Sequence, residues 1–506
     1  MMNKSGQGSI ADTLTIIITI MKKILISSLF VFGVSTCYSQ NVTPQQAYEQ
    51  FRKHANEEFD DFRKKANEQY AAFLKHAWEQ YKVLPAVPKP KDETIPPVVL
   101  PEGDKDTPIE SQPIPIKDVV TPPAPEPQPV PISPIKEQRN STNTIEFFYC
   151  GTKCKVRIDN TISLNLSDCS NDKLSGAWTM LSRGELMNNT IRDCLYLRES
   201  LNLCDWAYLN LLSTFTKKLY GKSNEATMLT SYIYCESGYK MRLGRNGSNI
   251  CLLYACKHGI YDVAYFEIDN INFYPFECEP KHLEICDASY PQEQPLSLFI
   301  TKKQKFEYKP SELRTLTSVQ YPDVQIQVQV NKNMIDFYNT YPTSEVNGNF
   351  MTKWAMYANT PLDGPVKEKL YPTLKDRIKG LSQLEAANIL LNWVQTAFVY
   401  EYDDKVWGHD RAFFAEETLY YPYCDCEDRS ILFTRLIRDL LGLKTILVYY
   451  PGHLASAVCF TDNVSGDYIS LNGKHYVITD PTYIGAPVGM TMPDMDNTQA
   501  HVILLE

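Results

Sequence analysis

The pattern of apolar and polar positions is most regular near the N-terminus, in a segment placed at residues 41 to 84. Within residues 45 to 84, three 11-residue units align without gaps: FRKHANEEFDD, FRKKANEQYAA and FLKHAWEQYKV. Because a period of 11 residues is about 3.67 residues per helical turn, the recurring aromatic side chains fall along one face of a helix. The segment is therefore predicted to be helical, either as a coiled coil or docking helix that binds a partner, or as a helix packed on its own domain.

A proline-rich segment, residues 85 to 136, follows the repeat. It contains half of the 32 prolines of the chain, in runs such as TPPAPEPQPVPISP. Sequences of this kind adopt the extended polyproline II conformation, which at about 3.1 Å per residue lets this segment reach roughly 100 Å or more. We expect a linker that holds the helical segment apart from the globular region.

Patterns typical of a globular α+β fold begin near residue 140. Residues 140 to 295 combine strand-like runs with helical patterns and are expected to form an α+β domain. Residues 296 to 375 are expected to be a β-rich connecting domain. The basis is VQIQVQV, residues 324 to 330, where valine or isoleucine alternates with glutamine as in a half-buried strand.

A third globular segment, residues 376 to 506, is predicted to begin with helices and to end with strands. Ser382 and Glu385 have the spacing of a capping box, which places a helix start at Ser382. A second helix is predicted from near Cys426 to Gly442, and the runs KTILVYY, LASAVCF and KHYVITD after it are strand-like.

The charge of the chain narrows the classes of function. The formal net charge is −10 and the sequence pI is about 5.5. Binding of nucleic acid requires clustered lysine and arginine, so this acidic balance argues against a nucleic-acid partner.

The run MKKILISSLFVFGVSTCYSQ, Met21 to Gln40, has the layout of a bacterial secretory signal peptide, with Met21 as the expected true start. Cleavage near Ser39 is favoured over lipidation of Cys37, and the alternative is an N-terminal extension with a signal anchor. We expect export to the periplasm, the cell surface or the medium, with no stable transmembrane span after cleavage.

Cysteine usage fits an oxidising compartment but does not reveal a pairing. The chain has 14 cysteines, and cleavage of the signal peptide leaves 13, so one thiol can remain free. Cys150 and Cys154 lie close enough to pair or to bind a metal, but no second pair with zinc spacing follows, and they are interpreted as structural.

Three residues of the last segment have the order that nucleophilic catalysis needs. Cys426 is placed at a helix start, where the first-turn N–H groups and the helix dipole favour a thiolate. His453 comes at the start of one predicted strand and Asp480 at the end of a later one. If these strands pair antiparallel, Asp480 can orient His453, which can take the proton of Cys426. The adjacent Glu427 and Asp428 oppose a thiolate but suit a helix N-terminus.

The blocks CEDRS, PGHLASAV and DPTY, in this order, resemble the transglutaminase-like superfamily of thiol enzymes, which has a papain-like fold. The resemblance covers roughly residues 380 to 490. It implies Cys426 as nucleophile, His453 as base and Asp480 as orienting residue. It implies no cofactor and no metal, and we see no acidic loop with calcium spacing.

Cys424 departs from the family pattern, which often has a glycine there, and it leaves alternatives open. It can form a disulfide with Cys426, or pair elsewhere. Cys424, Cys426 and His453 can also form a metal site, or the domain can be inactive and serve for binding. In addition, residues 202 to 276 show a similar order of elements, and they are either a degenerate copy or an unrelated α+β domain.

In a degenerate copy, Asn224 would replace Cys426, and His258 would match His453. No Asp-Pro follows, and asparagine cannot serve as the nucleophile. For the chain as a whole we expect an exported cysteine peptidase, amidase or acyltransferase with a peptide or protein substrate. The alternative is an inactive envelope binding or scaffold protein.

Overall fold

The computed structural model describes residues 44–76, 79–80, 95–102 and 109–506, so the expected signal peptide, with Met21 and Cys37, lies outside the described residues. The chain divides into two compact units, residues 1 to 60 and residues 61 to 506. The second unit is a mixture of helices and mostly antiparallel sheets, which confirms the α+β class. Among the described residues, no helix has both the length and the apolar character needed to cross a membrane.

Most of the 11-residue repeat forms α2 (Pro44–His76), as its period predicts. The helical prediction is wrong for Glu79–Gln80 in the last repeat unit, because these residues pair as a strand with Glu284 and Ile285. In the part of α2 that belongs to the second unit, Tyr70 is buried and its ring lies 4.3 Å from that of Trp178, while Phe62 and Phe73 are exposed. In this part of α2, Tyr70 therefore packs on the domain, whereas Phe62 and Phe73 face solvent. For residues 61 to 76, the interpretation as a helix packed on its own domain is confirmed.

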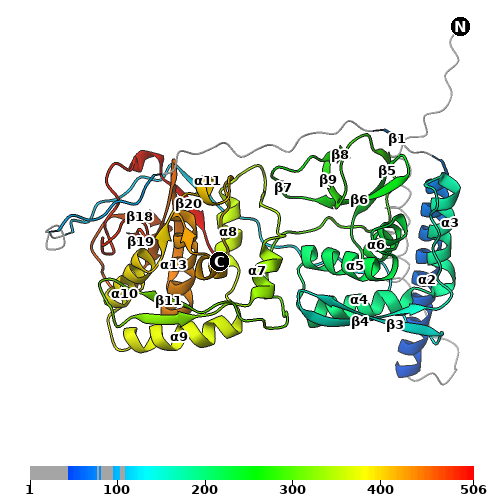
Figure 1. The fold of residues 1–506 in the computed structure, drawn as a ribbon, viewed down its shortest axis with the longest axis horizontal. Helices are drawn as coiled ribbons and strands as arrows, with labels where there is room; N and C mark the ends of the chain where they lie inside the picture. The colour runs from blue at the N-terminus through cyan, green and yellow to red at the C-terminus, as the bar shows by residue number, and fades with distance from the viewer. Residues whose placement is uncertain (1–43, 77–78, 81–94, 103–108) are drawn as a thin grey trace, which may run out of the picture. The chain divides into compact units, whose positions relative to one another are not determined.

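The first half of the second unit is built around a six-stranded antiparallel sheet. In order across the sheet, the strands are β1 (Glu79–Gln80), β10 (Glu284–Cys286), β5 (Met241–Asn246), β6 (Asn249–Cys256), β9 (Ile271–Phe276) and β8 (Phe266–Ile268). The chain enters the sheet from α5 (Asp205–Tyr220) and α6 (Asn224–Glu236), which pack against each other. Around them lie α3 (Asn171–Ser182), α4 (Asn188–Ser200) and the hairpin of β3 (Thr142–Tyr149) and β4 (Thr152–Asp159) (Figure 1).

The second half is built around another six-stranded sheet. In order, its strands are β18 (Tyr468–Leu471), β19 (Lys474–Thr479), β17 (His453–Cys459), β16 (Lys444–Tyr450), β20 (His501–Leu504) and β2 (Asp118–Val120). The helix α13 (Cys426–Leu441) packs on β16 and β17, and α10 (Gln383–Thr396) packs on α13 (Figure 1). Both helix starts fall where the sequence predicts them, with the expected capping box at Ser382 and a left-handed Gly442 after α13.

The two sheets share one strand order. Read from one edge, β8-β9-β6-β5-β10-β1 corresponds to β18-β19-β17-β16-β20-β2, with α6 and α13 each preceding the central hairpin. The edge strands differ, because β1 pairs antiparallel with β10 whereas β2 pairs parallel with β20. The proposed match of His258 to His453 is wrong, because His258 follows the end of β6 whereas His453 begins β17. His258 is a buried core residue, and burial lowers its pKa to about 4.

The proline-rich segment is not a free spacer where the structure describes it. Within residues 109 to 136, β2 adds a strand to the second sheet, and the side chain of Ile114 is buried. Farther along, the backbone oxygens of Pro129 and Ile135 accept hydrogen bonds of 2.9 and 2.7 Å from arginines of α4. Composition correctly predicts an extended backbone, but the isoleucines and valines among the prolines bury this part against the domain.

The expectation of a β-rich region at residues 296 to 375 is also wrong. The alternating run forms β12 (Gln325–Val328), paired with β11 (Arg314–Thr317), and β13 (Ser344–Glu345) adds two residues. The remaining elements are helices: α7 (Lys332–Tyr338), α8 (Thr352–Asn359) and α9 (Gly364–Ile378). Seven of the eight residues of α8 are buried, so burial on all sides removes the polar face that would reveal a helix in the sequence.

Candidate active site

The first predicted site residue, Cys426, is the first residue of α13 and is 3% exposed. Asp425 precedes it as the N-cap, and the carboxylate of Asp428 accepts hydrogen bonds from the backbone N–H groups of Asp425 (3.2 Å) and Phe413 (2.8 Å). These contacts fix the helix start. The thiol therefore lies at the positive end of the helix dipole, as the sequence predicts.

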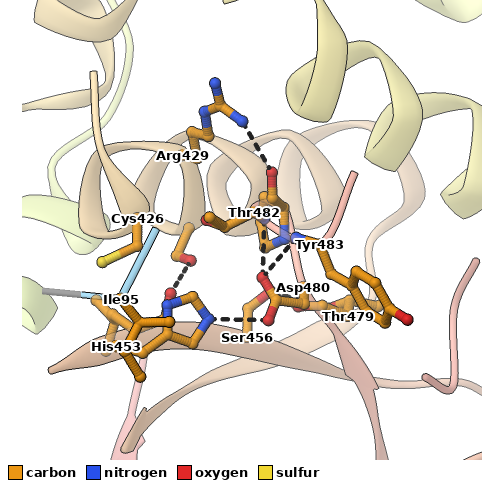
Figure 2. Close-up of polar contacts among 12 residues, drawn as sticks. Ile95, Cys426, Arg429, His453, Ser456, Thr479, Asp480, Thr482 and Tyr483 are labelled. Atoms are coloured by element: carbon orange, nitrogen blue, oxygen red, sulfur yellow. Dashed lines mark hydrogen bonds and ion pairs between the residues drawn. The ribbon is translucent and has the colours of Figure 1, made fainter. Parts of the chain in front are cut away.

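The second and third predicted residues are in contact. His453 Nε2 lies 2.8 Å from Oδ2 of Asp480, and both residues are buried (Figure 2). The contact follows from the antiparallel pairing of β17 with β19, because His453 begins β17 and Asp480 directly follows β19. The second carboxylate oxygen of Asp480 accepts the backbone N–H groups of Thr482 (2.8 Å) and Tyr483 (3.2 Å), which fixes its orientation.

The ring nitrogen of His453 that does not face Asp480 is placed to accept a proton. Because Nε2 faces Asp480, the imidazole holds its proton there when it is neutral, which leaves a lone pair on Nδ1. Nδ1 is buried and has no hydrogen-bond partner. A buried nitrogen without a partner costs free energy unless a donor reaches it, and Cys426 at the adjacent helix start is the candidate donor.

In this conformation the thiol of Cys426 faces another residue. Its Sγ donates to Oε2 of Glu427 at 3.2 Å, and in Figure 2 the sulfur is turned away from the imidazole of His453. Burial, then the charges of Glu427 and Asp425, raise the pKa of Cys426 well above its usual value, while the backbone N–H of Leu454 opposes them. The structure thus holds a neutral thiol beside an assembled histidine–aspartate pair.

The acidic surroundings of Cys426 are more extensive than the sequence suggests. Asp425 and Asp428 are buried beside Glu427, and burial followed by neighbouring carboxylates raises the pKa of both aspartates. Burial and Glu427 also raise the pKa of Asp403 to about 8. The carboxyl groups of Asp403 and Asp410 lie near Glu427, and the ammonium of the buried Lys353 lies 2.5 Å from Asp410.

In the described part of the chain, two groups have ligand atoms close enough together to hold a metal ion: Asp425 with Cys426 and Glu427, and Asp403 with Asp410 and Glu427. Neither group contains His453 or Cys424. Cys424 does not take part: its Sγ lies 3.8 Å from the backbone oxygen of Val399, in the short pairing of β15 (Tyr423–Cys424) with β14 (Val399–Tyr400). Cys424 and Cys426 are both free thiols, so the masking disulfide is not formed here.

A segment of the chain itself packs beside the site. The backbone N–H of Ile95 donates to Gly452 O at 3.2 Å, and the hydroxyl of Tyr400 donates to Ile95 O at 3.2 Å. Five residues on, Leu100 N donates to Ile484 O at 2.8 Å and its side chain is buried. We call residues 95 to 100 the strap. Sequence reasoning missed it, because nothing in IPPVVL indicates which surface it binds.

Two further buried side chains support the loop that carries Asp480, and sequence reasoning missed both. Gln395 on α10 directs its amide nitrogen at the backbone oxygen of Asp480, 3.0 Å away. Arg429 on α13 donates to Gln395 O at 3.1 Å and to Phe398 O at 2.9 Å. An arginine and a glutamine on otherwise apolar helix faces were the available signal, since buried polar groups need partners.

The chain was also compared with known proteins. No protein-family model, no curated protein and no solved structure matches it at a significant level.

Proposed function

We propose that the chain is a thiol enzyme with a transglutaminase-like, papain-like fold. It would act on peptide or protein amides through Cys426, His453 and Asp480. One arrangement supports this proposal: the His453–Asp480 pair leaves a buried, unpartnered Nδ1 next to a cysteine at a helix N-terminus. Nucleophile, base and orienting carboxylate are the groups that covalent catalysis requires.

The reaction begins when the side chain of Cys426 turns from Glu427 toward His453. The thiol proton passes to Nδ1, the sulfur bonds to the amide carbonyl carbon, and the C–N bond breaks with its electron pair remaining on nitrogen. The amine takes the proton from Nδ1 and leaves a thioester. Water, or a second amine, then gives its proton to Nδ1 and attacks the thioester carbon. The C–S bond breaks, and the departing thiolate takes the proton back from Nδ1.

Hydrolysis is favoured over transfer to an amine because water is abundant outside the cytoplasm. Cys426 and His453 are only 3% and 1% exposed in this state, so the strap must move away before a substrate can reach them in either reaction. Export is part of the proposal. The disulfide between Cys251 and Cys278 supports it, because structural disulfides persist in oxidising compartments.

A second candidate function is an inactive binding or scaffold protein of the cell envelope. The observation that favours it is the hydrogen bond from Cys426 to Glu427, with a pKa raised by burial and by two carboxylates. A thiol held in this way throughout would be unreactive, because the thiolate is the nucleophilic form.

Labelling with iodoacetamide separates the two candidates. The mature protein would be compared with the Cys426→Ala and His453→Ala variants, and the modified residue identified by mass spectrometry. Cys424, also buried, is an internal control for general access. Fast labelling of Cys426 that slows in His453→Ala supports the enzyme. Labelling of Cys426 no faster than that of Cys424, with or without mild reductant, supports the scaffold.

A further inference from the structure

The shared strand order of the two sheets allows a comparison position by position. Asn224 is the first residue of α6, as Cys426 is of α13. Each helix is followed by two strands that are joined by a two-residue turn. Asn246 pairs with Asn249 across the first turn, as Tyr450 pairs with His453 across the second. Asn249 therefore takes the place of His453, and not His258.

The third position and a hydrogen bond support the same alignment. Glu277 directly follows β9, as Asp480 directly follows β19. Ile250, the residue after Asn249, donates its backbone N–H to Oδ1 of Asn224 at 3.0 Å. In the second half Leu454, the residue after His453, directs its backbone N–H at the sulfur of Cys426. The first half thus has asparagine, asparagine and glutamate at the three triad positions, and it has no nucleophile there.

These three replacement residues line one cavity of about 550 Å³. The cavity is large because the first half has a smaller side chain and a shorter helix connection here than the second half. Thr227, which lines it, lies three residues into α6, the place that Arg429 occupies in α13. Arg429 is 1% exposed and fills its position with a guanidinium group. In addition, three residues join α5 to α6, whereas residues 397 to 425 lie between α10 and α13.

The residues around the cavity include a counterpart of Pro481, which contacts the Arg429 guanidinium in the second half. Cys278, which lines it, corresponds to Pro481, whose backbone oxygen lies 3.5 Å from the Arg429 guanidinium. The carboxylates of Glu277 and Glu279 also line the cavity, with Lys217 and Lys222. Lys217 forms an ion pair with Glu277, and Ser213 Oγ donates to the same carboxylate oxygen at 2.9 Å.

We propose that this cavity binds the guanidinium group of an arginine side chain of a peptide partner, in the place that Arg429 fills in the second half. An arginine can displace Lys217 from Glu277, because a guanidinium binds a carboxylate through two parallel hydrogen bonds whereas an ammonium binds it as a point charge. The site is separate from Cys426, and its occupation does not depend on the proposed enzyme activity.

Isothermal titration of the full mature chain with Nα-acetyl-arginine amide tests the proposal. The Cys426→Ala background would be used, so that turnover cannot consume the probe. Nα-acetyl-citrulline amide has nearly the same shape without the charge and should bind at least about tenfold more weakly. Saturable binding of the arginine probe with this preference is expected. No binding at millimolar concentration, or equal binding of both probes, overturns the proposal.

Variants locate the binding. Thr227→Arg places a guanidinium of the chain itself in the cavity and should abolish binding, whereas Thr227→Val, which adds no charge, should retain it. If Thr227→Arg does not fold, Glu277→Gln keeps the test decisive, because it removes the carboxylate and should weaken binding at least about tenfold. Binding of the probe that neither Thr227→Arg nor Glu277→Gln changes lies elsewhere and refutes the assignment.

Discussion

The buried side-chain amide of Gln395 holds the loop that carries Asp480, and its removal should lower the free energy of unfolding measurably. Gln395 is 1% exposed. Its Nε2 lies 3.0 Å from Asp480 O, 2.7 Å from Tyr483 O and 3.0 Å from Ala486 O, and its Oε1 accepts Gly485 N at 3.1 Å. A single side chain thus ties four residues of one loop to α10.

The substitution Gln395→Leu keeps the approximate volume and removes every one of these bonds. An amide has two donor protons, so about three bonds form at one time, each contributing about 1 kcal/mol, and buried backbone groups left without partners add to the loss. We expect a decrease of about 3 to 5 kcal/mol in the free energy of unfolding. Gln383→Leu, on the same helix but bonded to the exposed Thr461, should cost less than about 1 kcal/mol.

Urea unfolding, followed by tryptophan fluorescence, measures both variants, and Trp393 lies on the same helix. Gln395→Leu should lower the unfolding midpoint without changing the slope. It should also slow iodoacetamide labelling of Cys426, since Asp480 would no longer be held against His453. If Gln395→Leu is no less stable than Gln383→Leu, the bonds of Gln395 do not hold the loop and the reasoning fails.

Four further predictions concern the site. Asp480→Asn should slow labelling of Cys426 by about a hundredfold, since the base loses its charged partner. Glu427→Gln removes a carboxylate that raises the pKa of Cys426, so the pH profile of labelling should move to lower pH. Leu100→Ala should speed labelling, because it removes the buried anchor of the strap. Asp403→Asn should stabilise the protein at pH 8 more than at pH 5 in urea unfolding: burial and Glu427 raise the folded pKa of Asp403 to about 8, so ionisation costs stability as pH rises from about 4 to 8.

Each of these predictions has an outcome that contradicts it. Unchanged labelling in Asp480→Asn would mean that His453 does not act on the thiol. A profile that stays in place in Glu427→Gln would show that Glu427 does not raise the pKa of Cys426. Labelling of Leu100→Ala at the wild-type rate would show that the strap does not limit access. Equal stabilisation by Asp403→Asn at both pH values would exclude the raised pKa.

Local chemistry in the sequence determined several parts of the structure. The 11-residue period produced α2, alternation produced β12, and the capping box at Ser382 produced the start of α10. The order Cys426, His453, Asp480 was legible because each residue stands at the end of an element whose type is readable from its own neighbours. Pairing of two of those strands then brought His453 and Asp480 together.

Other features depend on contacts between residues far apart in the chain, which no local pattern encodes. The helix α8 is buried on all sides and shows no polar stripe. The strap, residues 95 to 100, is extended by composition, but only the folded domain decides that Ile95 bonds to Gly452, next to His453.

The comparison of the two halves shows this division most clearly. Sequence order suggested His258 as the counterpart of His453, because both histidines lie near a predicted strand. The strand register shows that the counterpart is Asn249 instead. Strand pairing, and not distance along the chain, fixes which residue lies beside the start of α6. Residue types thus determined where helices and strands begin. The tertiary structure decided which of their ends meet, because a site is defined by side chains that are close in space although they are far apart along the chain.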